Sequence, residues 1–162
     1  MSLLVADQDV RLRLSSTSKG SALASFANGL SQTAPELTEA NWGRIAEQIG
    51  QVCRQRSLVV LVTGLDPALY ADGLGTVLAG LAHDHQVLIA HVTDPGARAD
   101  ADAPITATSA YADAASARLG LATKALATRV TRMGVAVVQS DPDRLAPAVC
   151  DTYLSLKAAG RL

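Results

Sequence analysis

The feature that most constrains the fold is an apolar run that ends in an abrupt polar turn. Residues 58–62 contain only Leu and Val, and a Thr-Gly-Leu-Asp-Pro turn follows at residues 63–67. A run of such side chains without polar alternation is typical of a strand covered on both faces, as in the middle of a parallel sheet. In open α/β sheets, ligands bind outside the carboxyl ends of the strands. The run therefore predicts an α/β fold with Thr63 and Asp66 at the functional edge.

Strand and helix patterns alternate along the rest of the chain, which predicts a parallel sheet with helices on both faces. Arg11 and Arg13 alternate with apolar residues, so their strand is expected to be a half-exposed edge. Residues 94–108 are rich in Ala, Asp, Gly and Pro, and predict a mobile loop. The expected strands are residues 4–6, 10–14, 58–62, 86–92 and 135–139. The expected helices are residues 19–31, 38–54, 67–82, 109–132 and 145–159.

Composition narrows the classes of protein that need to be considered. A chain of 162 residues is expected to form one domain over residues 1–162, and 3% aromatic residues imply a core of Ala, Val and Leu. Fourteen basic and fifteen acidic residues give a net charge of -1, which argues against a nucleic-acid partner.

The two cysteines and the hydropathy pattern bear on localisation. Cys53 and Cys150 fit no metal-ligand spacing, and free thiols in a reducing cytoplasm are favoured over a disulfide. The sequence shows no signal peptide and no apolar run long enough to span a bilayer. We therefore expect a cytoplasmic location and no membrane contact by this segment.

Several segments, in the same order, resemble the von Willebrand factor A-like domain of the bacterial family known as domain of unknown function 58. The resemblance implies a Rossmann-like, mostly parallel sheet with strand order 3-2-1-4-5-6. It begins at the family's second strand, so the chain is expected to be a truncated domain that lacks the first strand and first helix. The matching segments are residues 4–11, 58–67, 87–95, 132–138 and 145–158.

The resemblance also implies where a metal-ion-dependent adhesion site would lie. Its ligands are an Asp-x-Ser-x-Ser motif, which this chain lacks, then a Thr and an Asp. Thr38 matches the Thr position, Gly64 falls at the Asp position, and Asp66 is two residues further on. Thr38 is equally well explained as a helix N-cap, and Asp66 as a turn and capping residue. We expect no metal in this chain, and Mg²⁺ only in a full-length protein that has the first strand.

Other candidate sites have stronger structural interpretations. His83, Asp84 and His85 are metal-ligand types, but they end a predicted helix, where the macrodipole favours cationic side chains. His91 falls inside a buried strand and is expected to be a satisfied core histidine. No Walker A sequence and no Gly-x-Ser-x-Gly elbow occurs, so we do not expect an enzyme.

The function that the resemblance implies is protein–protein interaction, in support of complex assembly or metal-cofactor insertion by a MoxR-type AAA+ ATPase. The expected binding edge contains Thr63, Asp66 and Asp94. One alternative is a hydrolase or phosphate-binding domain that uses Asp66 and Asp94; another is a purely structural domain. Without the first strand, residues 58–62 would face an empty position in the sheet. We expect a homodimer to fill that position, and a shift of the hairpin at residues 4–14 is the alternative.

Overall fold

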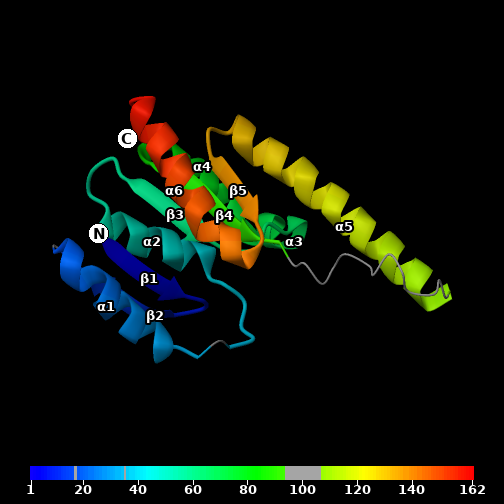
Figure 1. The fold of residues 1–162 in the computed structure, drawn as a ribbon, viewed down its shortest axis with the longest axis horizontal. Coiled ribbons are helices and arrows are strands. Elements are labelled where there is room, and N and C mark those ends of the chain that lie inside the picture. Colours follow the sequence, from blue (N-terminus) through cyan, green and yellow to red (C-terminus); the bar gives the residue numbers. More distant parts are fainter. Residues whose placement is uncertain (17, 35, 94–106) are drawn as a thin grey trace. The chain divides into compact units, whose positions relative to one another are not determined.

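The computed structural model describes residues 1–16, 18–34, 36–93 and 107–162, and the chain divides into two compact units, Met1–Arg54 and Gln55–Leu162 (Figure 1). Most of the loop predicted at residues 94–108 lies outside the described residues, and so does Asp94. The expectation of a single domain over the whole chain stays a prediction.

The first unit contains a β-hairpin and two helices. Strands β1 (Ser2–Ala6) and β2 (Val10–Ser15) pair antiparallel, as the sequence predicts. Helix α1 (Lys19–Ser31) contacts β2, and a Cβ at Gly29 would lie only 2.7 Å from a methyl group of Leu14. The lack of a side chain at Gly29 therefore permits the close approach of the helix to the strand.

Helix α1 buries one of its faces and leaves the neighbouring face exposed. Leu23 is 79% exposed. Ala22 and Phe26 are buried, and they share one face of the helix with Gly29. That is the face that approaches β2, so the neighbouring face with Leu23 is left in solvent.

Helix α2 (Trp42–Val52) is shorter than the predicted helix over residues 38–54, and the expectation that Thr38 caps it is wrong. Asn41 is the N-cap, and its side-chain oxygen accepts a hydrogen bond from the Arg44 N–H at 3.0 Å. The Asn41 N–H donates to the Asp7 carbonyl at 3.0 Å. Because this bond ties the backbone before Trp42 to the hairpin turn, the helix does not extend further back.

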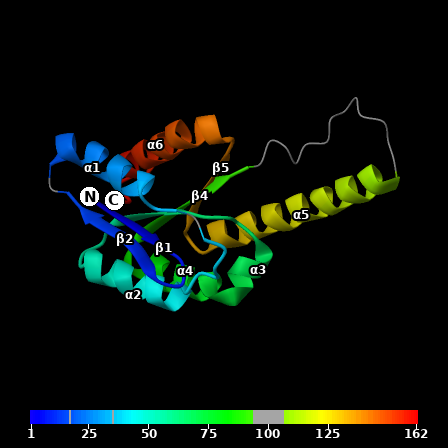
Figure 2. The ribbon, with the colours of Figure 1, turned by 90° about the horizontal axis from the view of Figure 1, so that it is seen from below.

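The second unit is an α/β fold with a three-stranded parallel sheet flanked by helices (Figures 1 and 2). The strands lie in the order β3 (Leu58–Val62), β4 (Gln86–Val92) and β5 (Ala136–Ser140). The helical elements are α3 (Pro67–Leu69), the π-helical turn η1 (Tyr70–Leu74), α4 (Gly75–Asp84), α5 (Ala107–Arg132) and α6 (Pro142–Ala158).

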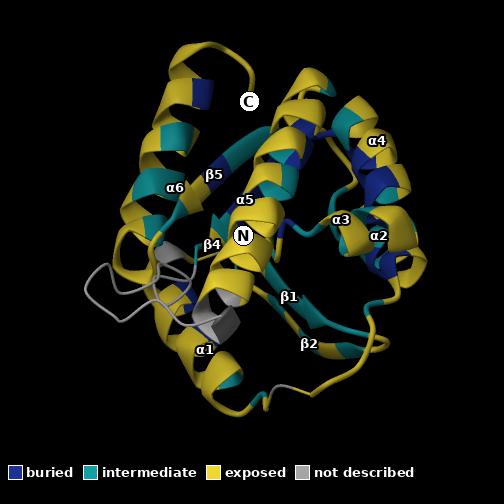
Figure 3. Ribbon diagram, turned by 90° about the vertical axis from the view of Figure 1, so that its right-hand side faces the viewer, coloured by how far each residue is buried: buried dark blue, intermediate teal, exposed yellow. Residues whose placement is uncertain are grey.

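Helices cover both faces of this sheet, and the core lies around β4. Leu88 and Ala90 form a buried cluster with Leu156 of α6. Val87 and Ile89 alternate with them along β4 and are also fully buried, on the side where α4 contacts the strand. Figure 3 shows how burial concentrates on the inner sides of the helices.

The connection after β3 was predicted as one helix over residues 67–82. It is interrupted instead at η1, where Gly73 has a φ of 122° that only glycine adopts readily. Tyr70 of this turn contacts α5: its hydroxyl lies 3.4 Å from the Met133 sulfur, and the Arg129 guanidinium lies 5.0 Å from the ring centre. Gly134, with a φ of 89°, follows the end of α5 in a conformation that favours glycine.

The expectation that residues 58–62 form a central strand covered on both faces is wrong. β3 is the last strand of its sheet, and Val60 and Val62 are 39% and 72% exposed. The fully covered strand is β4, and the β1–β2 hairpin forms a sheet of its own. An apolar run shows that a strand has high β-propensity, but it does not show how many neighbours the strand has.

Candidate functional site

The candidate site is the carboxyl end of the parallel sheet, where the predicted residues Thr63 and Asp66 lie. Thr63 continues the pairing of β3, because its N–H donates to the Ala90 carbonyl at 3.2 Å. Asp66 is the N-cap of α3, and its Oδ1 accepts a hydrogen bond from the Ala68 N–H at 2.6 Å. The interpretation of Asp66 as a capping residue is thus confirmed, and one of its carboxylate oxygens is committed to the helix.

His91 connects β4 to the turn that follows β3. Its Nδ1 accepts a hydrogen bond from the Leu65 N–H at 3.1 Å, which places the ring proton of the neutral imidazole on Nε2. The prediction of a satisfied histidine is confirmed, although the side chain is half-buried instead of lying in the core. The bond holds the backbone of the fully buried Leu65 against the end of the sheet.

A second polar contact, which the sequence did not reveal, joins the ends of β4 and β5. The Thr93 hydroxyl donates to Asp141 Oδ1 at 3.0 Å, and the Thr93 N–H donates to the Ser140 carbonyl at 2.9 Å. The available signal was that Thr93 directly follows the predicted strand at residues 86–92, and that Asp141 lies two residues after the one at residues 135–139. The polar side chains Asp66, His91 and Thr93 therefore all serve internal hydrogen bonds.

Two exposed apolar side chains lie beside these polar groups. Val62 and Val92 are the last residues of β3 and β4, and they are 72% and 42% exposed. Val62 is the register partner of Ala90, so alternation puts Val62 and Val92 on the same face of the sheet. We name Val62, Thr63, Asp66, Val92 and Thr93 the carboxyl-end surface.

Within the second unit, the expected adhesion-site positions Gly64 and Asp66 do not supply a set of metal ligands. Gly64 offers no side-chain oxygen, Asp66 caps α3, and Thr38 belongs to the first unit. The described parts of the chain contain no group of three or more His, Cys, Asp or Glu side chains that could hold a metal ion.

The histidines at the end of α4 do not cluster either. His83 and Asp84 are exposed, whereas His85 is 8% exposed and ends the helix with its N–H on the Leu81 carbonyl at 2.8 Å. The His85 Nδ1 atom is buried without a hydrogen-bond partner among the described residues. These observations agree with a structural role at the helix end.

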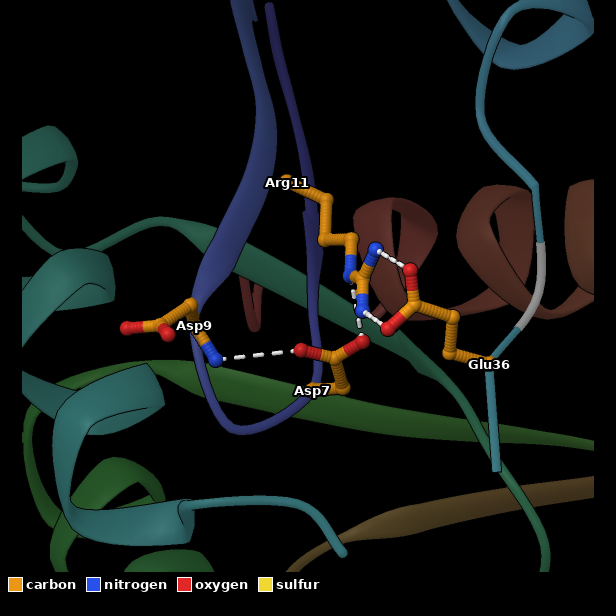
Figure 4. Close-up of polar contacts among 4 residues, drawn as sticks. All are labelled: Asp7, Asp9, Arg11 and Glu36. Atoms are coloured by element: carbon orange, nitrogen blue, oxygen red, sulfur yellow. Dashed lines mark hydrogen bonds and ion pairs between the residues drawn. The ribbon is translucent and has the colours of Figure 1, made fainter. Parts of the chain in front are cut away.

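The densest group of charges lies in the first unit and was not predicted (Figure 4). The Arg11 guanidinium donates from Nε to Asp7 Oδ2 at 2.5 Å and from Nη1 to Glu36 Oε1 at 2.5 Å, and its Nη2 donates to Glu36 Oε2. The Asp9 N–H donates to Asp7 Oδ1 at 3.0 Å. Glu36 is 25 residues from Arg11 in the sequence, and no motif signals their pairing.

The charge group shifts the pKa values of its members in the directions expected for ion pairs. The hydrogen bonds from Arg11 lower the pKa of Glu36. The pKa of Asp7 is lowered first by the Asp9 N–H, and further by Arg11 and the Thr38 hydroxyl. The single positive charge of Arg11 is thus shared between the carboxylates of Asp7 and Glu36, and this fastens the segment around Glu36 to the hairpin.

Comparison with known proteins does not assign the chain to a family. No protein-family model, curated protein or solved structure matches the chain. No helix in the described parts is long and apolar enough to cross a membrane. The structure therefore defines the class of protein only: an α/β protein whose three-stranded parallel sheet is flanked by helices.

Proposed function

We propose that the chain is a protein-interaction module that binds its partner at the carboxyl-end surface. The observation that carries this proposal is the exposure of Val62 and Val92 beside a polar rim. Exposed apolar side chains surrounded by polar groups are typical of protein interfaces. Val62 and Val92 would supply the apolar contact, and Thr63 and Thr93 would supply polar contacts around it.

The hydrogen bonds of the rim support binding over catalysis. Asp66 is committed to α3, His91 Nδ1 to Leu65, and the Thr93 hydroxyl to Asp141. A catalytic acid or base needs an atom that is free to donate or accept a proton and that lies within hydrogen-bond reach of the substrate. Polar groups fixed by internal bonds instead give a surface of constant shape, which lowers the entropic cost of binding a partner.

The identity of the partner rests on the resemblance to von Willebrand factor A-like domains. As part of the proposal, β3, β4 and β5 correspond to the fourth, fifth and sixth strands of such a domain. Their parallel order and the helices between them are compatible with that assignment. The proposed partner is then a MoxR-type AAA+ ATPase in the cytoplasm, and nucleic acid is not a partner because the net charge is -1.

The alternative is a hydrolase or phosphate-binding domain that uses Asp66 and Asp94. Asp94 lies outside the described residues, and the Asp66 carboxylate already caps a helix. Divalent-metal-dependent hydrolysis by the purified chain, lost in Asp66→Ala, would favour this alternative over the interaction module.

The proposal is tested by measuring binding to a purified MoxR-type ATPase from the same organism. We expect Val92→Asp to weaken binding at least about tenfold, because a carboxylate would have to be desolvated in the interface. Leu121→Asp is the matched control, since Leu121 is an apolar residue of α5 that is 69% exposed. Binding that Val92→Asp leaves unchanged, or that both variants weaken equally, would rule out the carboxyl-end surface.

A further inference from the structure

Strand β3 presents one row of backbone groups that the sheet does not use. The Ser57 carbonyl accepts from the Gln86 N–H at 3.0 Å, and the Thr63 N–H donates to the Ala90 carbonyl at 3.2 Å. Backbone groups alternate in direction along a strand, so the odd-numbered residues between them also face β4. The N–H and C=O groups of Leu58, Val60 and Val62 therefore point away from the sheet. Within the described residues, no hydrogen bond reaches these groups.

Residues 58–62 also lack the sequence features that keep edge strands from pairing with other chains. Residues 58–62 contain no charge and no proline, and their register with β4 shows no bulge. The hairpin of the first unit differs: β2 carries Arg11 and Arg13, and the register of β1 shifts between Val5 and Ala6. An apolar edge without protection is the kind that accepts a further strand.

We propose that the edge is filled by β3 of a second copy of this chain, antiparallel to the first. The two copies would be related by a two-fold axis through Val60, which is the usual symmetry of a dimer. Val60 of one copy then lies opposite Val60 of the other, and Leu58 lies opposite Val62. Every outward-pointing N–H and C=O of these residues gains a partner, and one continuous sheet crosses the dimer.

The symmetry of the strand and its flanking charges favour a second copy over an unrelated strand. Leu58 and Val62 are both two residues from Val60, so the inverted strand matches itself. Arg56 precedes the strand and Asp66 follows it, and Arg56 forms no ion pair among the described residues. Antiparallel pairing brings the basic start of one strand toward the acidic end of the other, whereas parallel pairing would bring the two Arg56 side chains together.

The dimer would also cover apolar surface that the helices leave open. α6 covers Leu88 and Ala90 of β4, but Val60 and Val62 remain exposed on the same face. In the proposed pairing, their side chains lie next to those of the second copy, where cross-strand contacts between β-branched residues are favourable. This inference goes beyond the proposed function because it concerns the side of the sheet and not its carboxyl end. The two surfaces share Val62, whereas Val92 belongs to the carboxyl end alone.

The oligomeric state of the full chain tests the proposal, measured by size-exclusion chromatography with light scattering over a dilution series. We expect a dimer for the wild type. Val60→Pro removes an N–H that does not face β4, so the monomer keeps its own sheet while the dimer loses its central bonds. We expect dimerisation to weaken at least about tenfold. Val60→Thr is the matched control, because it keeps the β-branched shape and the N–H, and it should remain dimeric.

Amide hydrogen exchange gives a second readout that does not depend on the variant. In the dimer, the amides of Leu58, Val60 and Val62 should be protected at high protein concentration and should exchange faster on dilution. The amides of Val59 and Leu61 should be protected throughout, because they face β4.

Three results would overturn the proposal. One is a monomeric wild type, whether or not the three outward amides are protected; protection in a monomer would mean that a segment of the same chain covers the edge. Another is a dimer that Val60→Pro does not weaken while circular dichroism shows native structure. The last is a dimer in which the amides of Leu58, Val60 and Val62 exchange as fast at high protein concentration as at low concentration.

Discussion

At the scale of single residues, the polar side chains near the sheet's carboxyl end mainly hold the backbone in place. Asp66 fixes the first turn of α3, and His91 fixes the turn at Leu65. Arg11 has the same role in the first unit, where it fastens Glu36 to the hairpin. Arg11 and its partners are accessible to solvent. High salt, which screens the charges, and low pH, which protonates the carboxylates, should therefore weaken these ion pairs.

The Arg11–Glu36 pair predicts how the stability of the first unit depends on pH. The pKa values of Glu36 and Asp7 lie below their ordinary values of 4.5 and 3.8, so unfolding raises them. Their contribution to stability is complete above about pH 4.5 and is lost as the pH falls through the folded pKa values. We expect Glu36→Gln to lower the melting temperature at pH 7, and the difference from wild type to disappear near about pH 3.

The fluorescence of Trp42 is the appropriate measurement, because this buried side chain of the first unit is the only tryptophan. Glu39→Gln is the control, since the described residues show no ion pair for Glu39. A destabilisation by Glu36→Gln that grows as the pH falls, or that Glu39→Gln reproduces, would contradict the assigned role.

At the scale of elements, local patterns predicted most helices and strands, but they did not predict pairing. β4 has the predicted bounds, Gln86–Val92, and α1 has the predicted bounds, Lys19–Ser31. The bounds of α2 were wrong because the bond between Asn41 and Asp7 joins residues far apart in the sequence. The apolar run of β3 predicted a strand covered on both faces, which is wrong, whereas the expectation of an unfilled position beside residues 58–62 agrees with the strand order of the described residues.

In the candidate site too, contacts between residues close in the sequence could be predicted, whereas contacts between distant residues could not. Asp66 could be predicted as a cap, because an Asp directly before a Pro is a local signal for the start of a helix. The partners of His91 and Thr93 could not be predicted, since Leu65 lies 26 residues from His91 and Asp141 lies 48 residues from Thr93.

The interruption at η1 gives a prediction about one element. Gly73 has a φ of 122°, so Gly73→Ala should destabilise the protein by about 1–3 kcal/mol through backbone strain. Gly80→Ala is the matched control, because Gly80 lies in α4 and a Cβ there would meet nothing within 4 Å. It should be neutral or stabilise by up to about 1 kcal/mol. Urea unfolding measures both, and equal effects of the two changes would mean that η1 is an ordinary helical turn in solution.

At the scale of the whole molecule, the residues of the expected adhesion site are divided between the two units. Thr38 lies in Met1–Arg54, where its hydroxyl contributes to the low pKa of Asp7. Gly64 and Asp66 lie in Gln55–Leu162, at the carboxyl end of the parallel sheet. The resemblance suggested these positions, and the hydrogen bond of Asp66 shows that it caps α3 within its own unit.

These contacts predict that the chain does not bind Mg²⁺ or Mn²⁺ tightly. Mg²⁺ requires an octahedral set of oxygen ligands, and tight protein sites supply carboxylates that are free to coordinate it. Gly64 supplies no side-chain oxygen, and Asp66, one of whose carboxylate oxygens is bonded to the Ala68 N–H, is a single carboxylate. Isothermal titration with either cation should therefore give no saturable heat at micromolar concentration. Saturable binding that is lost in Asp66→Ala would contradict this prediction and would show that the carboxyl end of the sheet is a metal site.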